Sequence, residues 1–226
     1  RQQKLYTASA LKLKEALAGG AWSGNGKLEV LSQLMRLRQI CCDPALCFED
    51  YTGESAKLET CVSLIASASA AGHKILLFSQ FASMLERIRE RLLQEGISSH
   101  LLVGATPKEE RSRMVQAFAS DEVPVFLISL KAGGTGINLT AADIVIHYDP
   151  WWNVAAQNQA TDRAYRIGQE KPVTVYKLIL KDTIEENLLK LQNAKLALAA
   201  QVVSEGMVSL GDLSQNELME LFEQNP

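Results

Sequence analysis

Short apolar runs alternate with amphipathic segments through the middle of this 226-residue chain. The runs predict buried strands at residues 74–78, 100–103, 123–129, 144–148 and 173–180. The segments between them carry apolar residues at the three- and four-residue spacing of one helix face. These residues are Leu85, Ile88 and Leu92 in one segment and Met114, Val115 and Phe118 in another. The alternation predicts an α/β fold, in which a mostly parallel sheet carries helices on both faces.

Both ends of the chain show helical patterns instead. Residues 1–18 and 27–40 predict two helices, because glycines within 19–26 separate two stretches of helical spacing. After residue 182 an apolar stripe continues for about five helical turns. The stripe consists of Ile184, Leu188, Leu191, Leu198 and Val202.

The C-terminal helix has a clear start. Thr183 or Asp182 can cap it, and Glu185 and Glu186 suit the positive end of its dipole. A capping-box pattern at 214–217 predicts a last short helix. We therefore expect three parts, namely a helical segment at 1–56, the α/β domain at 57–181 and a helical extension at 182–226.

Composition narrows the class of protein. A chain with 47% hydrophobic and 22% charged residues is typical of folded globular proteins, and a net charge of −3 gives no overall basic field. No apolar run is long enough to span a membrane, so no membrane partner is expected. The four cysteines lack Cys-x-x-Cys pairs, which predicts reduced, structural cysteines in a cytoplasmic protein rather than a metal site. The start without methionine suggests a segment of a longer protein.

Polar or glycine-rich loops follow three of the predicted strands, at residues 79–81, 130–136 and 149–153. Because the carboxyl ends of parallel strands meet at one edge of a sheet, we expect these loops to form a site. Glycines 133, 134 and 136, with Lys131 and Thr135, can present amide and side-chain donors to phosphate oxygens. The alternative is a tight turn that needs glycine only for its geometry. His73, His100 and His147 lie in or beside strands, which favours structural roles for them.

A second candidate feature is the segment 159–169. If it is helical, Gln159, Arg163 and Arg166 share one face, and two guanidiniums on one face suit a polyphosphate. The alternative is an exposed helix on which Asp162 pairs with Arg166. The chain has no Gly-Lys-Ser/Thr loop and no acidic box for magnesium, so it lacks two parts that nucleotide hydrolysis needs. It can still supply an arginine finger.

Three segments in order carry a specific resemblance. They are Lys74–Phe81, then Ser129–Leu139 with its Gly-Gly-Thr-Gly, then Gln159–Gln169 with its Arg-Ile-Gly-Gln ending. Together they resemble the second RecA-like lobe of Swi/Snf-type DNA translocases, which are double-stranded-DNA-stimulated ATPases of helicase superfamily two. The resemblance covers nearly the whole chain, and Thr183–Val203 is similar to the bracing helix of that family. It implies a RecA-like sheet with an N-terminal helical segment and C-terminal bracing helices.

The resemblance also implies roles for individual residues. Arg163 and Arg166 would be arginine fingers that reach ATP on the other lobe, and Gln159 would orient them or touch phosphate. Gly134 and Gly136 would contact the nucleotide. The DNA backbone would be contacted by Ser79, Gln80, Lys131, Thr135, Gly104 and Thr106. The implied cofactors are ATP and Mg²⁺, held mainly by the first lobe. The implied partners are double-stranded DNA, that N-terminal lobe and further proteins, in the cytoplasm or on a bacterial nucleoid.

Some positions depart from the family pattern. Tyr165 stands where histidine is commoner, as in bacterial members, and Asp43 stands where the family often has histidine. Val103-Gly104-Ala105-Thr106 replaces Asp-Gly-Ser-Thr, so that backbone amides would have to face the phosphate there. Two other readings remain open: a RecA-like lobe that only binds a partner, and a small-molecule transferase. On the preferred reading, the isolated chain would not hydrolyse ATP.

Overall fold

The computed structural model describes residues 1–20, 26–130, 132, 139–164, 171–199, 219 and 221–222. The chain forms two compact units. The helical unit comprises Arg1–Lys57, Trp152–Val154 and Ile179–Pro226, and the sheet unit comprises Leu58–Trp151 and Ala155–Leu178. The terminal segments that the sequence separated as 1–56 and 182–226 thus belong to the same unit.

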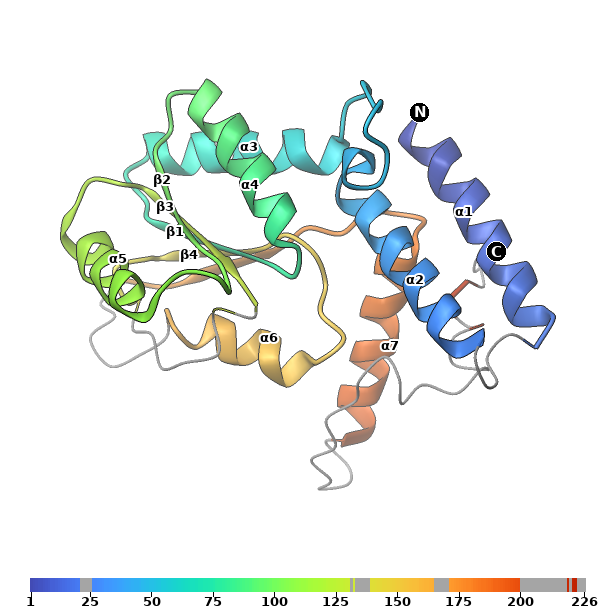
Figure 1. Ribbon diagram of the computed structural model, residues 1–226. Coiled ribbons are helices and arrows are strands. Elements are labelled where there is room, and N and C mark those ends of the chain that lie inside the picture. The colour runs from blue at the N-terminus through green and yellow to red at the C-terminus, as the bar shows by residue number, and fades with distance from the viewer. Residues whose placement is uncertain are drawn as a thin grey trace. The chain divides into compact units, whose positions relative to one another are not determined.

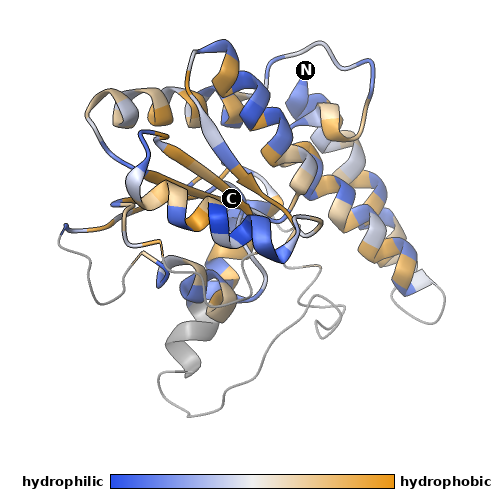
Figure 2. Ribbon diagram, turned by 60° about the vertical axis from the view of Figure 1, so that its left-hand side comes forward, coloured by the Kyte–Doolittle hydropathy of each residue, from blue (hydrophilic) through white to orange (hydrophobic). Residues whose placement is uncertain are grey.

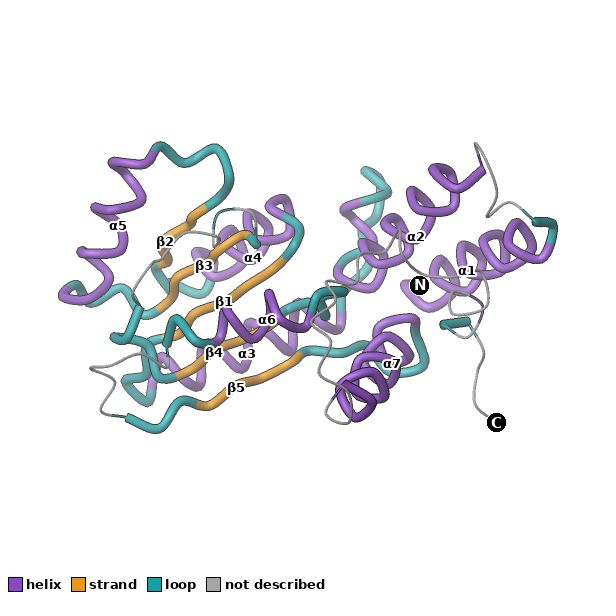
Figure 3. The backbone as a smooth tube through the Cα atoms, turned by 90° about the horizontal axis from the view of Figure 1, so that it is seen from below, coloured by secondary structure: helices purple, strands orange, loops and turns teal. Residues whose placement is uncertain are grey.

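The sheet unit is built on five parallel strands (Figures 1 and 3). They are β1 (Ile75–Ser79), β2 (Ser99–Leu102), β3 (Val125–Ser129), β4 (Ile144–His147) and β5 (Thr174–Lys177), in the spatial order β2-β3-β1-β4-β5. Every residue of β1, β3 and β4 is buried, as expected of strands covered on both faces, and these strands are strongly hydrophobic (Figure 2). The predicted parallel α/β sheet is confirmed.

Helices cover both faces of the sheet (Figure 1). They are α3 (Ala56–Ala70) and α4 (Ala82–Gln94) on one face, and α5 (Lys108–Ser120) and α6 (Val154–Thr161) on the other. Phe118 of α5 and Ala160 of α6 join Leu76, Phe78 and Phe126 of the strands in one buried cluster. This packing removes a large apolar area from water and fixes both helices against the sheet.

The edge strand β5 differs from the prediction. The apolar run 173–180 predicted a long buried strand, but β5 covers only Thr174–Lys177 and none of its residues is fully buried. It lies at the edge of the sheet, where only one side has a neighbouring strand. The apolar residues around it therefore serve other contacts, and Val173 and Val175 pack against the cluster of α5 and α6.

The helical unit contains α1 (Gln2–Ala18), α2 (Gly26–Cys42), the 3₁₀ turn η1 (Pro44–Leu46) and α7 (Ile184–Ala199). Both predicted N-terminal helices are confirmed within a residue or two. Their core consists of Leu13, Leu17, Val30, Leu34, Leu37, Cys41, Ile184, Leu188 and Leu221. Thr183 caps α7, because its hydroxyl accepts the Glu185 amide at 3.3 Å and donates to the Leu180 carbonyl at 2.6 Å. The predicted helix at 214–217 lies outside the described residues.

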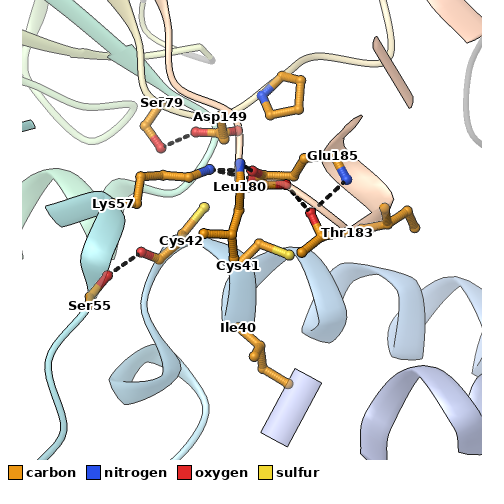
Figure 4. A network of polar contacts seen from close by, with 12 residues as sticks. Ile40, Cys41, Cys42, Ser55, Lys57, Ser79, Asp149, Leu180, Thr183 and Glu185 are labelled. Atoms are coloured by element: carbon orange, nitrogen blue, oxygen red, sulfur yellow. Dashed lines mark hydrogen bonds and ion pairs between the residues drawn. The ribbon is translucent and has the colours of Figure 1, made fainter. Parts of the chain in front are cut away.

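A buried ion pair joins Lys57, at the start of α3, to Glu185 of α7, and both residues belong to the helical unit (Figure 4). Nζ of Lys57 lies 2.5 Å from the Glu185 carboxylate, and Glu185 also accepts the Leu180 amide at 2.9 Å. Burial is the largest single influence and lowers the pKa of Lys57, but the charge of Glu185, with smaller effects of Cys42, Cys41 and the Glu185 hydrogen bond, raises it overall. Burial, helped by Glu185, raises the pKa of the nearby Cys41 thiol, so this cysteine is protonated and structural. In the described part of the chain, no helix is long and apolar enough to cross a membrane.

Candidate functional site

The loops after β1 and β4 meet at the carboxyl edge of the sheet, as predicted. Ser79 ends β1, and its hydroxyl donates to Oδ1 of Asp149 at 2.6 Å (Figure 4). The side-chain amide of Gln80 donates to Oδ2 of Asp149 at 2.9 Å and to the Pro150 carbonyl at 3.0 Å. The backbone amide of Gln80 adds a longer bond to Asp149, at 3.2 Å. One carboxylate thus holds the turn that leads from β1 into α4.

The two residues predicted to contact DNA in this turn differ in exposure. Ser79 is fully buried, and its oxygen also accepts the Phe81 amide at 3.1 Å. Gln80 is half-buried. Ser79 therefore stabilises the turn from inside, while part of the Gln80 side chain is exposed to solvent. Whether either contacts DNA stays a prediction.

A second predicted loop follows β2. Gly104 is exposed and Thr106 is half-buried. The Thr106 hydroxyl accepts the Val103 amide at 3.1 Å, and the Thr106 amide donates to the Val103 carbonyl at 3.1 Å. These bonds close a tight turn and use the amide of Thr106. Of the backbone amides predicted here as phosphate donors, that of Thr106 is thus occupied inside the loop.

A shared face for Gln159 and Arg163 depended on a helix that continues through residue 163, and this condition is not met. α6 stops at Thr161, and the next amides, of Arg163 and Ala164, bond three residues back in turns. The Arg163 carbonyl accepts the Leu139 amide at 3.3 Å. Gln159 is exposed, whereas Arg163 is only 4% exposed. The two side chains therefore do not share one exposed helical face.

Gln157, rather than Gln159, is the buried glutamine of α6. It is 1% exposed, and its Oε1 accepts the Trp151 amide at 3.3 Å. The sequence pattern assigned it no role. Its position three residues before the buried Ala160, on the face that packs on the sheet, was the signal that could have identified it.

His147 connects β4 to the same helix. Its Nε2 lies 2.8 Å from the Thr161 hydroxyl, which donates in turn to the Gln157 carbonyl at 3.3 Å. Burial, with a smaller effect of Lys177 on the neighbouring strand, lowers the pKa of His147 from 6.5 to about 4. The sequence predicted a structural histidine at this position, and the lowered pKa adds that it is neutral near pH 7.

The other two histidines also have structural partners. His73 lies 2.9 Å from Asp143, and His100 lies 2.6 Å from Asp121. Among the residues that the structure describes, no group of three or more histidines, cysteines or acidic residues is placed to hold a metal ion. Lys131, Gly134, Thr135, Gly136 and Arg166 lie outside the described residues, so the structure does not test their predicted roles.

Asp149 was the main omission of the sequence analysis. Its loop was predicted to belong to the site, but the residue received no role. An acidic residue directly after a buried strand was the available signal, although its partners on β1 depend on strand order.

Comparison with known families gives one clear match. Residues 56–168 match the helicase conserved C-terminal domain. The candidate ATP-dependent helicase/translocase YwqA of Bacillus subtilis is 44% identical over 205 residues, which covers 87% of this chain and 22% of that protein. The chain spans about a fifth of the length of the curated relatives it matches.

Two solved structures from Sulfolobus solfataricus share the fold. The SWI2/SNF2 ATPase core in complex with double-stranded DNA is 34% identical, with a TM-score of 0.81 over 100% of this chain and 48% of that chain. The SWI2/SNF2 ATPase C-terminal domain is 32% identical, with a TM-score of 0.78 over 100% of this chain and 94% of that chain. The second likeness extends over nearly all of a solved C-terminal domain of that ATPase.

Proposed function

Because the chain belongs to the helicase conserved C-terminal domain family, in its SWI2/SNF2 branch, we propose that it is the second ATPase lobe of a double-stranded-DNA translocase. The observation that carries the proposal is the position of Arg163 in a chain that has no phosphate loop of its own. Arg163 lies two residues after the end of α6, and bonds from His147, at the end of β4, and from the Trp151 amide hold that helix. Because this chain has no phosphate loop, the nucleotide that Arg163 would contact is expected to be bound by another lobe.

The chemical role of the arginines follows from their charge. Arg163 and Arg166 stabilise the negative charge that develops on the γ-phosphate as it is transferred to water. Gln159, with Gly134 and Gly136, would contact the nucleotide when the two lobes close. Mg²⁺ would neutralise the phosphates, and its ligands are expected on the first lobe, because the described residues offer no acidic cluster for it.

The DNA would be held through its backbone. Gln80 and the amides of Gly104 and Ala105 would contact it, and Lys131 and Thr135, which follow β3 in the sequence, are expected to join them. Ser79 acts indirectly, because it and Gln80 bond the same Asp149 carboxylate. The DNA complex of the Sulfolobus relative supports this choice of partner. Phosphate contacts do not read base sequence, and the binding they give weakens steeply as salt rises. Opening and closing of the lobes would then move the grip along the duplex.

The test is ATP hydrolysis by the full-length protein, with and without double-stranded DNA, beside the isolated chain. We expect DNA to stimulate hydrolysis in the full-length protein and the isolated chain to be inactive, because the phosphate loop is missing. Hydrolysis by the isolated chain would refute the division of the active site between two lobes. A full-length protein that binds DNA without hydrolysing ATP would identify a lobe that acts only as a binding module.

A further inference from the structure

Arg111 lies on α5, beside two of the loops at the carboxyl edge of the sheet. Its Nε donates to the Thr106 carbonyl at 2.8 Å, and Nη2 donates to the Gly104 carbonyl at 2.9 Å. Nη1 reaches the Ala132 carbonyl, which follows β3, at 3.4 Å. One guanidinium therefore bonds three backbone carbonyls from two different loops.

This arrangement is specific to arginine. A guanidinium has five N–H donors in a rigid, planar fork, so it can hold several acceptors at fixed angles. A lysine ammonium has the same charge but sits as a single point at the end of a flexible chain. It can neutralise the same region, but it cannot hold three carbonyls of two loops in the same geometry.

The bonds also orient the backbone. In a trans peptide the carbonyl and the following N–H point in opposite directions. Because the Gly104 carbonyl points at Arg111, the N–H of Ala105 points away from it. Gly104 and Ala105 are exposed, and their amides have no partner within the described part of the chain. Arg111 thus sets which face of the loop carries available donors.

We infer that Arg111 is a positioning residue, whose bonds to Gly104, Thr106 and Ala132 fix the 104–106 loop against the chain after β3 and so orient the amides that the proposed function assigns to the DNA backbone. The inference deepens the proposed function and rests on it for the identity of the ligand. Its structural half, the connection of the loops by one guanidinium, does not depend on DNA.

Arg113 provides a matched control. It has the same charge on the same helix, two residues away, and it is exposed without a bond partner among the described residues. Replacement by alanine therefore removes the same charge at either position. Only a change at Arg111 also removes the hydrogen bonds that hold the loops. The variants are Arg111→Lys, Arg111→Ala, Arg113→Lys and Arg113→Ala in the full-length protein.

The first measurement is hydrogen exchange of residues 100–107 without DNA, with unfolding followed for every variant. We expect Arg111→Lys to speed exchange of the Val103 and Thr106 amides roughly tenfold, because the turn that protects them loosens. Arg113→Lys should match the wild type. Unchanged hydrogen exchange in Arg111→Lys would overturn the inference, whatever the DNA affinity of that variant.

The second measurement is affinity for a DNA duplex across a range of salt concentrations. We expect Arg111→Lys to bind about tenfold more weakly although it keeps the charge, and Arg113→Lys to stay within about twofold of the wild type. If Arg111→Lys binds normally while Arg111→Ala binds weakly, with a shallower salt dependence, Arg111 contacts phosphate directly and the positioning role is wrong. A wild type that binds no DNA refutes the proposed function, and the exchange data still decide whether Arg111 holds the loops.

Discussion

The Ser79 hydroxyl donates a hydrogen bond of 2.6 Å to the Asp149 carboxylate, and both side chains are buried. The bond joins the ends of the neighbouring strands β1 and β4, which carry two of the loops of the candidate site. Asp149 accepts the backbone and side-chain amides of Gln80 as well. Removal of this one carboxylate would leave several donors without an acceptor in a place that water reaches poorly.

Asp149→Ala should therefore destabilise the sheet unit by about 2–4 kcal/mol, since each buried donor left unsatisfied costs about 1–3 kcal/mol. Denaturant unfolding followed by circular dichroism measures the change. Asp162→Ala is the control, because Asp162 is exposed, and it should cost less than about 0.5 kcal/mol. Equal, small losses for the two variants would show that Asp149 does not hold the turn.

His147 makes stability depend on pH. Its pKa is about 4 in the folded chain and 6.5 in an ordinary environment, so the unfolded chain binds the extra proton between these values. The unfolding free energy is therefore unaffected by protonation of His147 above pH 6.5. It decreases as pH falls toward 4, by about 3 kcal/mol in total.

Unfolding free energies measured from pH 4 to pH 7 for the wild type and His147→Gln test this expectation. Other groups titrate alike in both proteins, so the difference between the two curves isolates His147. The curves should converge as pH falls. Parallel curves would mean that the histidine is not held neutral by burial.

The Lys57–Glu185 pair gives a different kind of prediction, because both partners are buried. Lys57→Met leaves the Glu185 charge buried with only part of its partners and should destabilise the helical unit by about 3–5 kcal/mol. The double variant Lys57→Met, Glu185→Leu should recover much of that loss, because no uncompensated charge remains.

A double-mutant cycle by denaturant unfolding measures the coupling between Lys57 and Glu185. Lys190 and Glu186 form an exposed pair on α7, whose coupling should be about 0.3–0.5 kcal/mol. Additive effects of Lys57→Met and Glu185→Leu would contradict a coupled buried pair.

The sequence predicted the sheet well because strands that are buried on both faces consist of continuous apolar residues, as in β1, β3 and β4. It also placed the loops of Ser79 and Asp149 at one edge, since parallel strands share their direction. The end of α6 was not predictable in this way. Helical spacing continues to Arg166, but the structure ends the helix at Thr161, where Arg163 bonds the distant Leu139.

The individual partners of the site residues were likewise beyond the sequence. That Asp149 would meet Ser79 requires β4 to lie beside β1, and many strand orders fit the same apolar pattern. The bonds of Arg111 to Gly104 and Ala132 depend on how α5 packs on the sheet. The sequence therefore predicted that the loops of Ser79 and Asp149 lie at one edge of the sheet, while strand order and packing determined which side chains hold them.

The central claim, that Arg163 acts on ATP bound by another lobe, is tested most directly by the kcat of DNA-stimulated hydrolysis in the full-length Arg163→Ala protein. Because Arg163 is buried, its replacement can also affect folding. The unfolding free energy and the DNA affinity of the variant protein are therefore measured on the same sample. We predict a fall in kcat of roughly 10³-fold or more with DNA affinity retained within about twofold. A kcat equal to the wild type, or a loss of hydrolysis that merely follows loss of folding or of DNA binding, would contradict the claim.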